Sequence, residues 1–216
     1  MTASEVGTMT GNNGTVYQTV KIGSQWWMAE NLKETRYRNS DAIPEVTDGT
    51  TWAGLSTGAR CAYSNNASTA NTYGYLYNWL AVNDSRNIAP AGWHVPTDDE
   101  WKTMEKYLGM SQAEADGELW RGTDEGGKLK ESDYTHWQSP NTGAINEVDY
   151  TALPGGYRQT DGDFDKLGYE AWFMTSTEAD PVDVWPRTLF YDQSTIDRRY
   201  YFENKKCGYS IRLVKD

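Results

Sequence analysis

The segment from residue 169 to 202 carries the side chains best suited to contact a ligand. It interleaves tryptophan, tyrosine and phenylalanine with arginine and acidic residues. Aromatic rings and arginine are enriched at recognition surfaces, and sugar rings stack on tryptophan and tyrosine. Because alternate residues of a strand point to opposite faces, about half of these side chains would pack in a core and the outward half would contact a ligand. The predicted contacts are Trp172, Phe173, Trp185, Arg187, Thr188 and Tyr191.

Catalytic chemistry has few candidate residues in this chain. His94 lies inside the segment Trp-His-Val-Pro, and His136 precedes Trp137. Neither histidine belongs to a nucleophile motif of the hydrolases. We therefore interpret each as a hydrogen-bonded or exposed imidazole, and we predict no catalytic residue and no enzymatic activity.

The two cysteines, Cys61 and Cys207, lie too far apart in the sequence for a local Cys-x-x-Cys metal or redox motif. They either form one long-range disulfide or are two small buried hydrophobic side chains. A chain of this length buries enough apolar surface to fold without a disulfide.

Three aspartates, Asp161, Asp163 and Asp165, alternate as they do at the start of an EF-hand calcium loop. Lys166 occupies the glycine position of that motif and Trp172 the position of its bidentate glutamate, so the motif is not met. We predict a hairpin turn with solvated aspartates instead. The oxygen-rich loops elsewhere are compatible with a structural Ca²⁺, for which the sequence names no ligand set.

Charge excludes several classes of partner. The formal net charge is -11 and the isoelectric point about 4.7, so the chain lacks the cationic surface that nucleic acids and anionic membranes require. No apolar run is long enough to cross a membrane. The segment 122–127 lacks the Lys-Ser/Thr ending of a phosphate-binding P-loop.

At 216 residues, the chain is predicted to be one domain over 15–216 after a flexible lead at 1–14.

Periodicity predicts strands at the start and helices in the middle of the chain. Residues 15–22 alternate as a strand, and a turn at Gly23 leads into a second strand at 25–28. Helices are expected over 72–82, over 97–108, where Thr97 and Glu100 have capping-box spacing, and from Ser111, where the same spacing recurs. The stretches 39–72 and 122–149 are predicted to be irregular, with a tight bend at residues 126–127.

The C-terminal third is predicted to be β-structure. The expected strands are 150–159, broken at residues 155–156, then 171–177, 184–191, 195–202 and 209–214. Strands, then two to three helices, then a β-rich end with long loops predict a single α+β domain.

A set of motifs in a fixed order resembles one bacterial family. The segment AGWHVPTDDEW at 91–101 is similar to a signature of the Fibrobacter succinogenes major paralogous domain, which is related to formylglycine-generating enzymes and C-type-lectin-like folds. The other motifs of the resemblance lie at 14–23, 25–32, 73–79, 140–144, 152–158, 175–178 and 208–212.

The resemblance implies a C-type-lectin-like fold and an exported, extracellular or cell-surface protein, often a lipoprotein, whose signal or anchor has been removed from this sequence. Structural Ca²⁺ is common in the related enzymes. Those enzymes bind copper through two late cysteines, whereas Cys207 is the only late cysteine here. We therefore expect a monomeric, non-catalytic module that binds a glycan or a protein. A divergent enzyme of that type and a purely structural surface domain are the alternatives.

The late strands depart from the family pattern at residues that alternate with retained ones. Either exposed positions have drifted, or the alternating face is a diversified ligand surface, as in variable proteins served by retroelements. The second hypothesis predicts a solvent-open patch. Its members are Trp185, Pro186, Arg187, Thr188 and Tyr191, and the departing positions are Phe173, Met174, Val184, Pro186 and Thr188.

Overall fold

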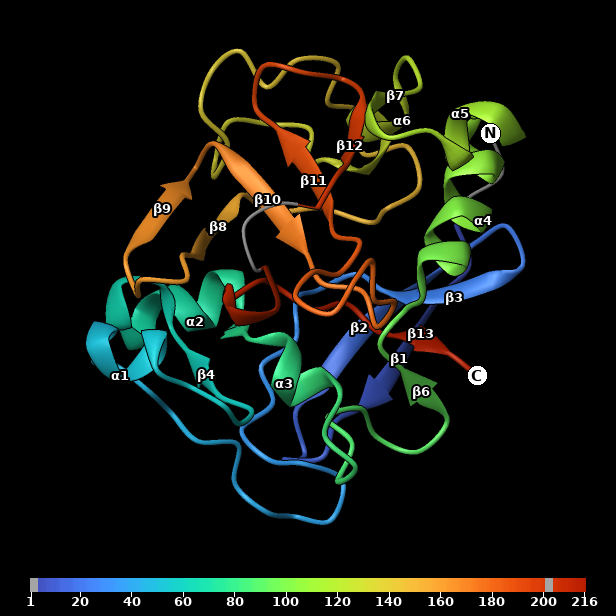
Figure 1. Cartoon of the computed structure of the whole chain (residues 1–216). Helices are drawn as coiled ribbons and strands as arrows, with labels where there is room; N and C mark the ends of the chain where they lie inside the picture. The colour runs from blue at the N-terminus through green and yellow to red at the C-terminus, as the bar shows by residue number, and fades with distance from the viewer. Residues whose placement is uncertain (1–3, 201–203) are drawn as a thin grey trace.

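Three β-sheets and six short α-helices make up the part of the chain that the computed structural model describes, residues 4–200 and 204–216 (Figure 1). This arrangement confirms the predicted α+β class, with more and shorter helices than the two or three expected. Within the described residues no helix is long and apolar enough to span a bilayer.

The first sheet joins the two ends of the chain. It has the order β1-β2-β3-β13-β6, so the last strand lies between β3 and β6. The predicted hairpin is confirmed: β2 and β3 pair antiparallel on either side of Gly23, whose φ of +61° is accessible to glycine at little cost. The strands are β1 (Val6–Thr10), β2 (Val16–Ile22), β3 (Gln25–Met28), β6 (Trp93–His94) and β13 (Val214–Lys215).

The second sheet positions the candidate site. Its order is β7-β12-β11-β10-β8-β9, in which β8 and β10 run parallel and the other neighbours antiparallel. A two-stranded sheet of β4 (Arg60–Cys61) and β5 (Leu76–Tyr77) completes the β-structure. The strands of the second sheet are β7 (Leu119–Arg121), β8 (Gly155–Arg158), β9 (Phe164–Leu167), β10 (Glu170–Phe173), β11 (Arg187–Phe190) and β12 (Ile196–Arg198).

Two of the predicted helices begin where the capping boxes placed them. The Thr97 hydroxyl accepts the amide of Glu100, and the Glu100 carboxylate accepts the amide of Thr97, at the start of α4 (Asp98–Leu108). Ser111 and Glu114 repeat the arrangement at α5 (Gln112–Asp116). Each box satisfies amides at the helix start that have no partner within the helix.

Replacing Thr97 with alanine is expected to lower the free energy of unfolding by about 1 kcal/mol, since the cap of α4 is lost. Thr103→Ala is the matched control, because that exposed threonine bonds only a carbonyl of its own helix and alanine favours helix. Urea denaturation of both variants measures the difference. Equal stability of the two variants would show that Thr97 does not stabilise the helix start.

The helix expected at 72–82 is wrong. The chain forms α2 (Ala67–Tyr73), turns at Gly74 with φ +76°, pairs through β5 and then forms α3 (Trp79–Val82). The amides of Tyr75 and Tyr77 donate to Leu32 and Tyr209. Distant backbone partners have therefore replaced the hydrogen bonds of a continuous helix.

The two stretches expected to be irregular contain short helices. Residues 39–72 include α1 (Gly49–Ala53), capped by Asp48, and most of α2, capped by Asn66. The predicted bend at residues 126–127 is instead the first turn of α6 (Glu125–Leu129). A side chain at Gly126 or Gly127 would collide with the backbone of Thr195 or Gly143, so these glycines permit close packing of loops rather than a turn.

The C-terminal strands are shorter than predicted, and residues 201–202 of the expected strand at 195–202 lie outside the described residues. The segment expected as a strand at 209–214 contacts several partners in turn. Tyr209 bridges to Tyr77, Ser210 to Phe173, and Val214 pairs with Trp27. Because this segment crosses from one sheet to another, it cannot form one continuous ladder.

A buried ionic cluster joins α4 to the inner face of the second sheet. Asp98 of α4 pairs with Arg187 and Arg198, with N–O distances of 2.8 Å. Glu105 pairs with Arg187 and with Arg121, the latter at 2.8 Å. Arg187 and Glu105 are 0 % exposed. The cluster fixes which face of this sheet points inward.

Candidate ligand-binding pocket

The strand register separates the two faces of the second sheet. Trp120 lies opposite Asp197, Asp197 opposite Thr188, and Thr188 opposite Trp172. Residues directly opposite each other project from the same face, and this row lies on the face away from α4. We call it the outer face. Phe173 and Arg187 oppose each other on the inner face.

The predicted solvent-open patch is therefore wrong. Arg187 and Phe173 are 0 % exposed and Thr188 is 1 % exposed, so these three cannot contact a ligand in this structure. The departing positions Met174, Val184 and Pro186 are buried as well. Drift of surface residues and diversification of a ligand surface both require that the positions departing from the family pattern be exposed. Because these positions are buried, neither explanation fits them.

The other three predicted contacts are half-buried and lie apart. Trp185 packs against Tyr200 and under the guanidinium of Arg198, 3.7 Å from the ring centroid. Tyr191 packs edge-on against Tyr169. Trp172 lines a pocket of the described part of the chain.

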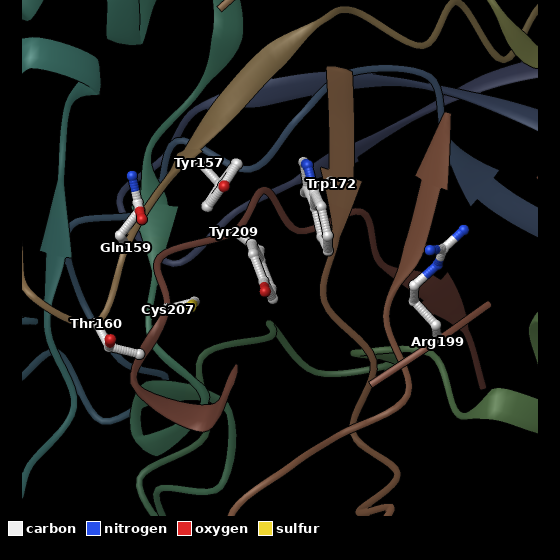
Figure 2. A pocket seen from close by; sticks show the side chains of 7 residues that line it. All are labelled: Tyr157, Gln159, Thr160, Trp172, Arg199, Cys207 and Tyr209. Atoms are coloured by element: carbon white, nitrogen blue, oxygen red, sulfur yellow. The ribbon is translucent and has the colours of Figure 1, made fainter. Parts of the chain in front are cut away.

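That pocket lies where β8, β10 and the segment after the last 3₁₀ turn (Asn204–Lys206) meet. Figure 2 shows three aromatic side chains grouped between polar residues on one side and an arginine on the other. The cavity volume is about 230 Å³. Its lining residues are Tyr157, Gln159, Thr160, Trp172, Arg199, Cys207 and Tyr209.

The three aromatic rings contact one another. Trp172 and Tyr209 stack with centroids 5.0 Å apart and an interplanar angle of 15°. Tyr157 is tilted against Trp172 at 5.0 Å and against Tyr209 at 6.1 Å. Because each ring is held by two others, the aromatic surface is ordered before any ligand arrives. We call these three residues the aromatic cluster.

Hydrogen bonds and burial fix the chemistry of the pocket. The Trp172 indole donates to the Glu170 carboxylate at 2.8 Å, which sets the orientation of the ring. Burial, with the charges of Asp165 and Glu170, raises the pKa of Tyr157 to about 12, and burial raises the pKa of Tyr209 well above 10. Both phenols are therefore neutral at physiological pH.

Arg199 brings a positive charge to the pocket, but that charge is balanced. It forms an ion pair with Asp197, which is 1 % exposed, and its guanidinium lies 5.2 Å from the ring centroid of Trp120. Arg199 thus borders both the pocket and Trp120.

The two cysteines are buried free thiols in this structure. Burial raises the pKa of Cys61 to about 12 and that of Cys207 to about 11. The thiolate is the reactive form of cysteine, so both side chains are chemically inert near neutral pH.

Both histidines pair with carboxylates. His94 bonds Glu100 at 2.7 Å and Asp216 at 2.6 Å, and His136 bonds Glu131 at 2.8 Å. In the chain as described, neither bonds a serine, threonine or cysteine, and no three acidic, histidine or cysteine side chains come together as a metal site. The turn at residues 161–163 joins β8 to β9 as predicted, with the Gln159 amide donating to Asp163.

Sequence reasoning missed most of the pocket. Tyr157 and Tyr209 lie in the family motifs at 152–158 and 208–212 and are not among the predicted ligand contacts. Gln159, Thr160 and Cys207 gave no sequence signal for a shared site, since residues about 50 apart in the chain meet only through strand pairing.

Fold and pocket together define an α+β domain with a small pocket lined by aromatic side chains. The model of the Fibrobacter succinogenes major domain matches residues 20–215. The chain therefore belongs to that family, as its motifs indicated. None of the curated proteins and none of the solved structures matches this chain.

Proposed function

We propose that this protein is a non-catalytic, surface-displayed recognition module that binds a glycan in the aromatic pocket. The observation that carries the proposal is the aromatic cluster, three rings held in place around a cavity with neutral polar groups. Ligand sites are typically concave and mostly apolar, with a few polar groups that fix orientation. The Gln159 amide and Thr160 hydroxyl supply such groups for sugar hydroxyls.

Size favours a sugar over a protein ligand. The cavity of about 230 Å³ lies below the range of roughly 300–1,000 Å³ that holds drug-sized molecules, which suits one ring. A stable protein partner would need an interface of about 1,000 Å² or more, far beyond this pocket. The alternative ligand for a recognition module is a protein that inserts a single aromatic or sugar-like group into this pocket.

The chemistry of the thiols and histidines argues against an enzyme of the formylglycine-generating type. Such an enzyme binds copper through two neighbouring cysteines, whereas Cys61 and Cys207 are buried in two different hydrophobic clusters. Each histidine is engaged by carboxylates rather than by a nucleophile. We extend the proposal to a C-type-lectin-like fold, export to the cell surface and a monomeric state, with Ca²⁺ as a structural ion at most.

The test measures sugar binding by calorimetry. The probes are glucose, xylose, mannose and N-acetylglucosamine, each with its linear β-1,4-linked tetrasaccharide. Trp172→Ala is expected to weaken binding of the preferred sugar about tenfold or more, because one face of the cluster is lost. Trp172→Phe should retain most of the affinity. Tyr107→Ala is the matched control, since that tyrosine is 62 % exposed on α4, against the opposite face of the sheet.

Thermal melts of each variant establish that it is folded. If Trp172→Ala unfolds, Gln159→Ala tests the same pocket through its polar group. Binding unaffected by both variants would place the ligand elsewhere. The absence of saturable binding to any probe would favour the structural surface domain.

A further inference from the structure

A second aromatic platform lies on the outer face, three strands from Trp172. Trp120 of the edge strand β7 is 43 % exposed and packs on Phe190 of β11 with centroids 4.5 Å apart. Strands are about 4.8 Å apart, so the backbones of the two tryptophans are about 14 Å apart across the sheet. The two tryptophans therefore offer separate contacts, one at the pocket and one at the edge of the sheet.

Arg199 connects the platform to the pocket. The same guanidinium lies over Trp120 and lines the cavity that holds the aromatic cluster. Asp197 and Thr188, which lie between the two tryptophans in the register, are buried, so Arg199, whose side chain is 21 % exposed, provides surface between them. The pocket and Trp120 therefore belong to one continuous contact surface.

The charges around this surface favour a neutral ligand. The ion pair with Asp197 offsets the charge of Arg199. Asp161 and Asp163 lie in the turn beside Gln159, Asp165 lies opposite Tyr157, and Glu170 holds Trp172. With a net charge of -11, this environment repels an anionic sugar chain.

We propose that the ligand is a neutral linear oligosaccharide, with one ring in the pocket and a more distant ring stacked on Trp120. The inference rests on the proposed glycan function and adds a second subsite to it. Flat pyranose rings with equatorial substituents present the apolar faces that stacking on Trp120 and Trp172 requires. Because β7 is the edge strand, the far end of the oligosaccharide is free to continue into solvent.

The experiment compares each monosaccharide with its tetrasaccharide on two variants. Trp120→Ala is expected to weaken tetrasaccharide binding about tenfold and leave monosaccharide binding unchanged, because only the longer ligand reaches the second platform. Trp120→Tyr should restore binding, since it returns an aromatic face. Trp172→Ala should weaken binding of both ligands, and Tyr107→Ala of neither.

The outcomes separate the two proposals. Loss of binding with Trp172→Ala but not with Trp120→Ala overturns the second subsite and leaves the pocket standing, whereas indifference to both variants overturns both. On the unaltered protein, a monosaccharide that binds as tightly as its tetrasaccharide also overturns the second subsite, whether or not Trp120→Ala folds. A tetragalacturonate that binds more tightly than the neutral tetrasaccharides contradicts the choice of a neutral ligand.

Discussion

Replacing Arg187 with alanine is expected to lower the free energy of unfolding by about 3–5 kcal/mol, the cost of removing one partner from a buried ion pair. Arg187 is 0 % exposed and lies between Asp98 and Glu105. Without it, Glu105 retains Arg121, Asp98 retains Arg198 and Lys102, and both carboxylates remain buried. Urea denaturation at neutral pH measures the loss.

The matched control is Arg86→Ala. Arg86 also pairs with two carboxylates, Asp41 and Asp84, but its side chain is 37 % exposed. Exposed ion pairs contribute about 1 kcal/mol or less, so this variant should be close to the unaltered protein in stability. Similar decreases in the free energy of unfolding for the two variants would show that burial does not determine how much the Arg187 contacts stabilise the fold. The sequence predicted that Arg187 belongs to a solvent-open patch, and an exposed side chain would contribute little to stability. The two variants therefore also test that prediction against the structure.

Acid is expected to destabilise the protein progressively as the pH falls below about 5, because the ionic cluster depends on ionised carboxylates. Burial would raise the pKa of Asp98 and Glu105. The bonds and charges of Arg187, Arg198 and Arg121 outweigh burial and hold both pKa values below their usual range. A carboxyl whose pKa is lowered in the folded state stabilises the fold above the pKa of the unfolded chain, and that contribution disappears as the pH falls.

Other buried groups act in the opposite direction. Burial raises the pKa of Glu34, Glu170 and Asp197, and the bonds to Asp216 and Glu100 raise that of His94 despite its burial. Folding therefore favours the protonated form of these four groups. The contribution of His94 grows as the pH falls toward its ordinary pKa of 6.5. That of the three carboxyls grows as the pH falls toward their ordinary pKa values of 4.5 and 3.8, where it partly offsets the loss from the cluster. We expect a stability maximum on the weakly acidic side of neutrality, followed by the steep loss.

Urea midpoints from pH 7.5 to pH 3 test this profile. Asp98→Asn is the informative variant, because an amide does not titrate. It should be less stable at pH 7 and should lose less stability below about pH 5 than the unaltered protein. Stability that does not change down to pH 3 would contradict the assignment of acid sensitivity to the cluster. The same dependence of the urea midpoint on pH in the unaltered protein and in Asp98→Asn would also contradict it.

Local contacts explain what the sequence determined by itself. Thr97 with Glu100, and Ser111 with Glu114, satisfy helix starts within four residues, so their spacing alone located α4 and α5. Gly23 and the turn at residues 161–163 join neighbouring strands in the same way. The order of motifs was also sufficient to identify the family, which the match over residues 20–215 confirms.

Tertiary structure decided everything that depends on a distant partner. The alternation of the late strands defined two faces, but only the carboxylates of α4 determined that Arg187 points inward and Trp172 outward. The helix expected over 72–82 is interrupted at Gly74, since Leu32 and Tyr209 offer backbone partners from elsewhere. The pocket joins Tyr157, Trp172 and Tyr209 through strand pairing and ring stacking, and contacts between residues so far apart in the chain have no local pattern from which to be predicted.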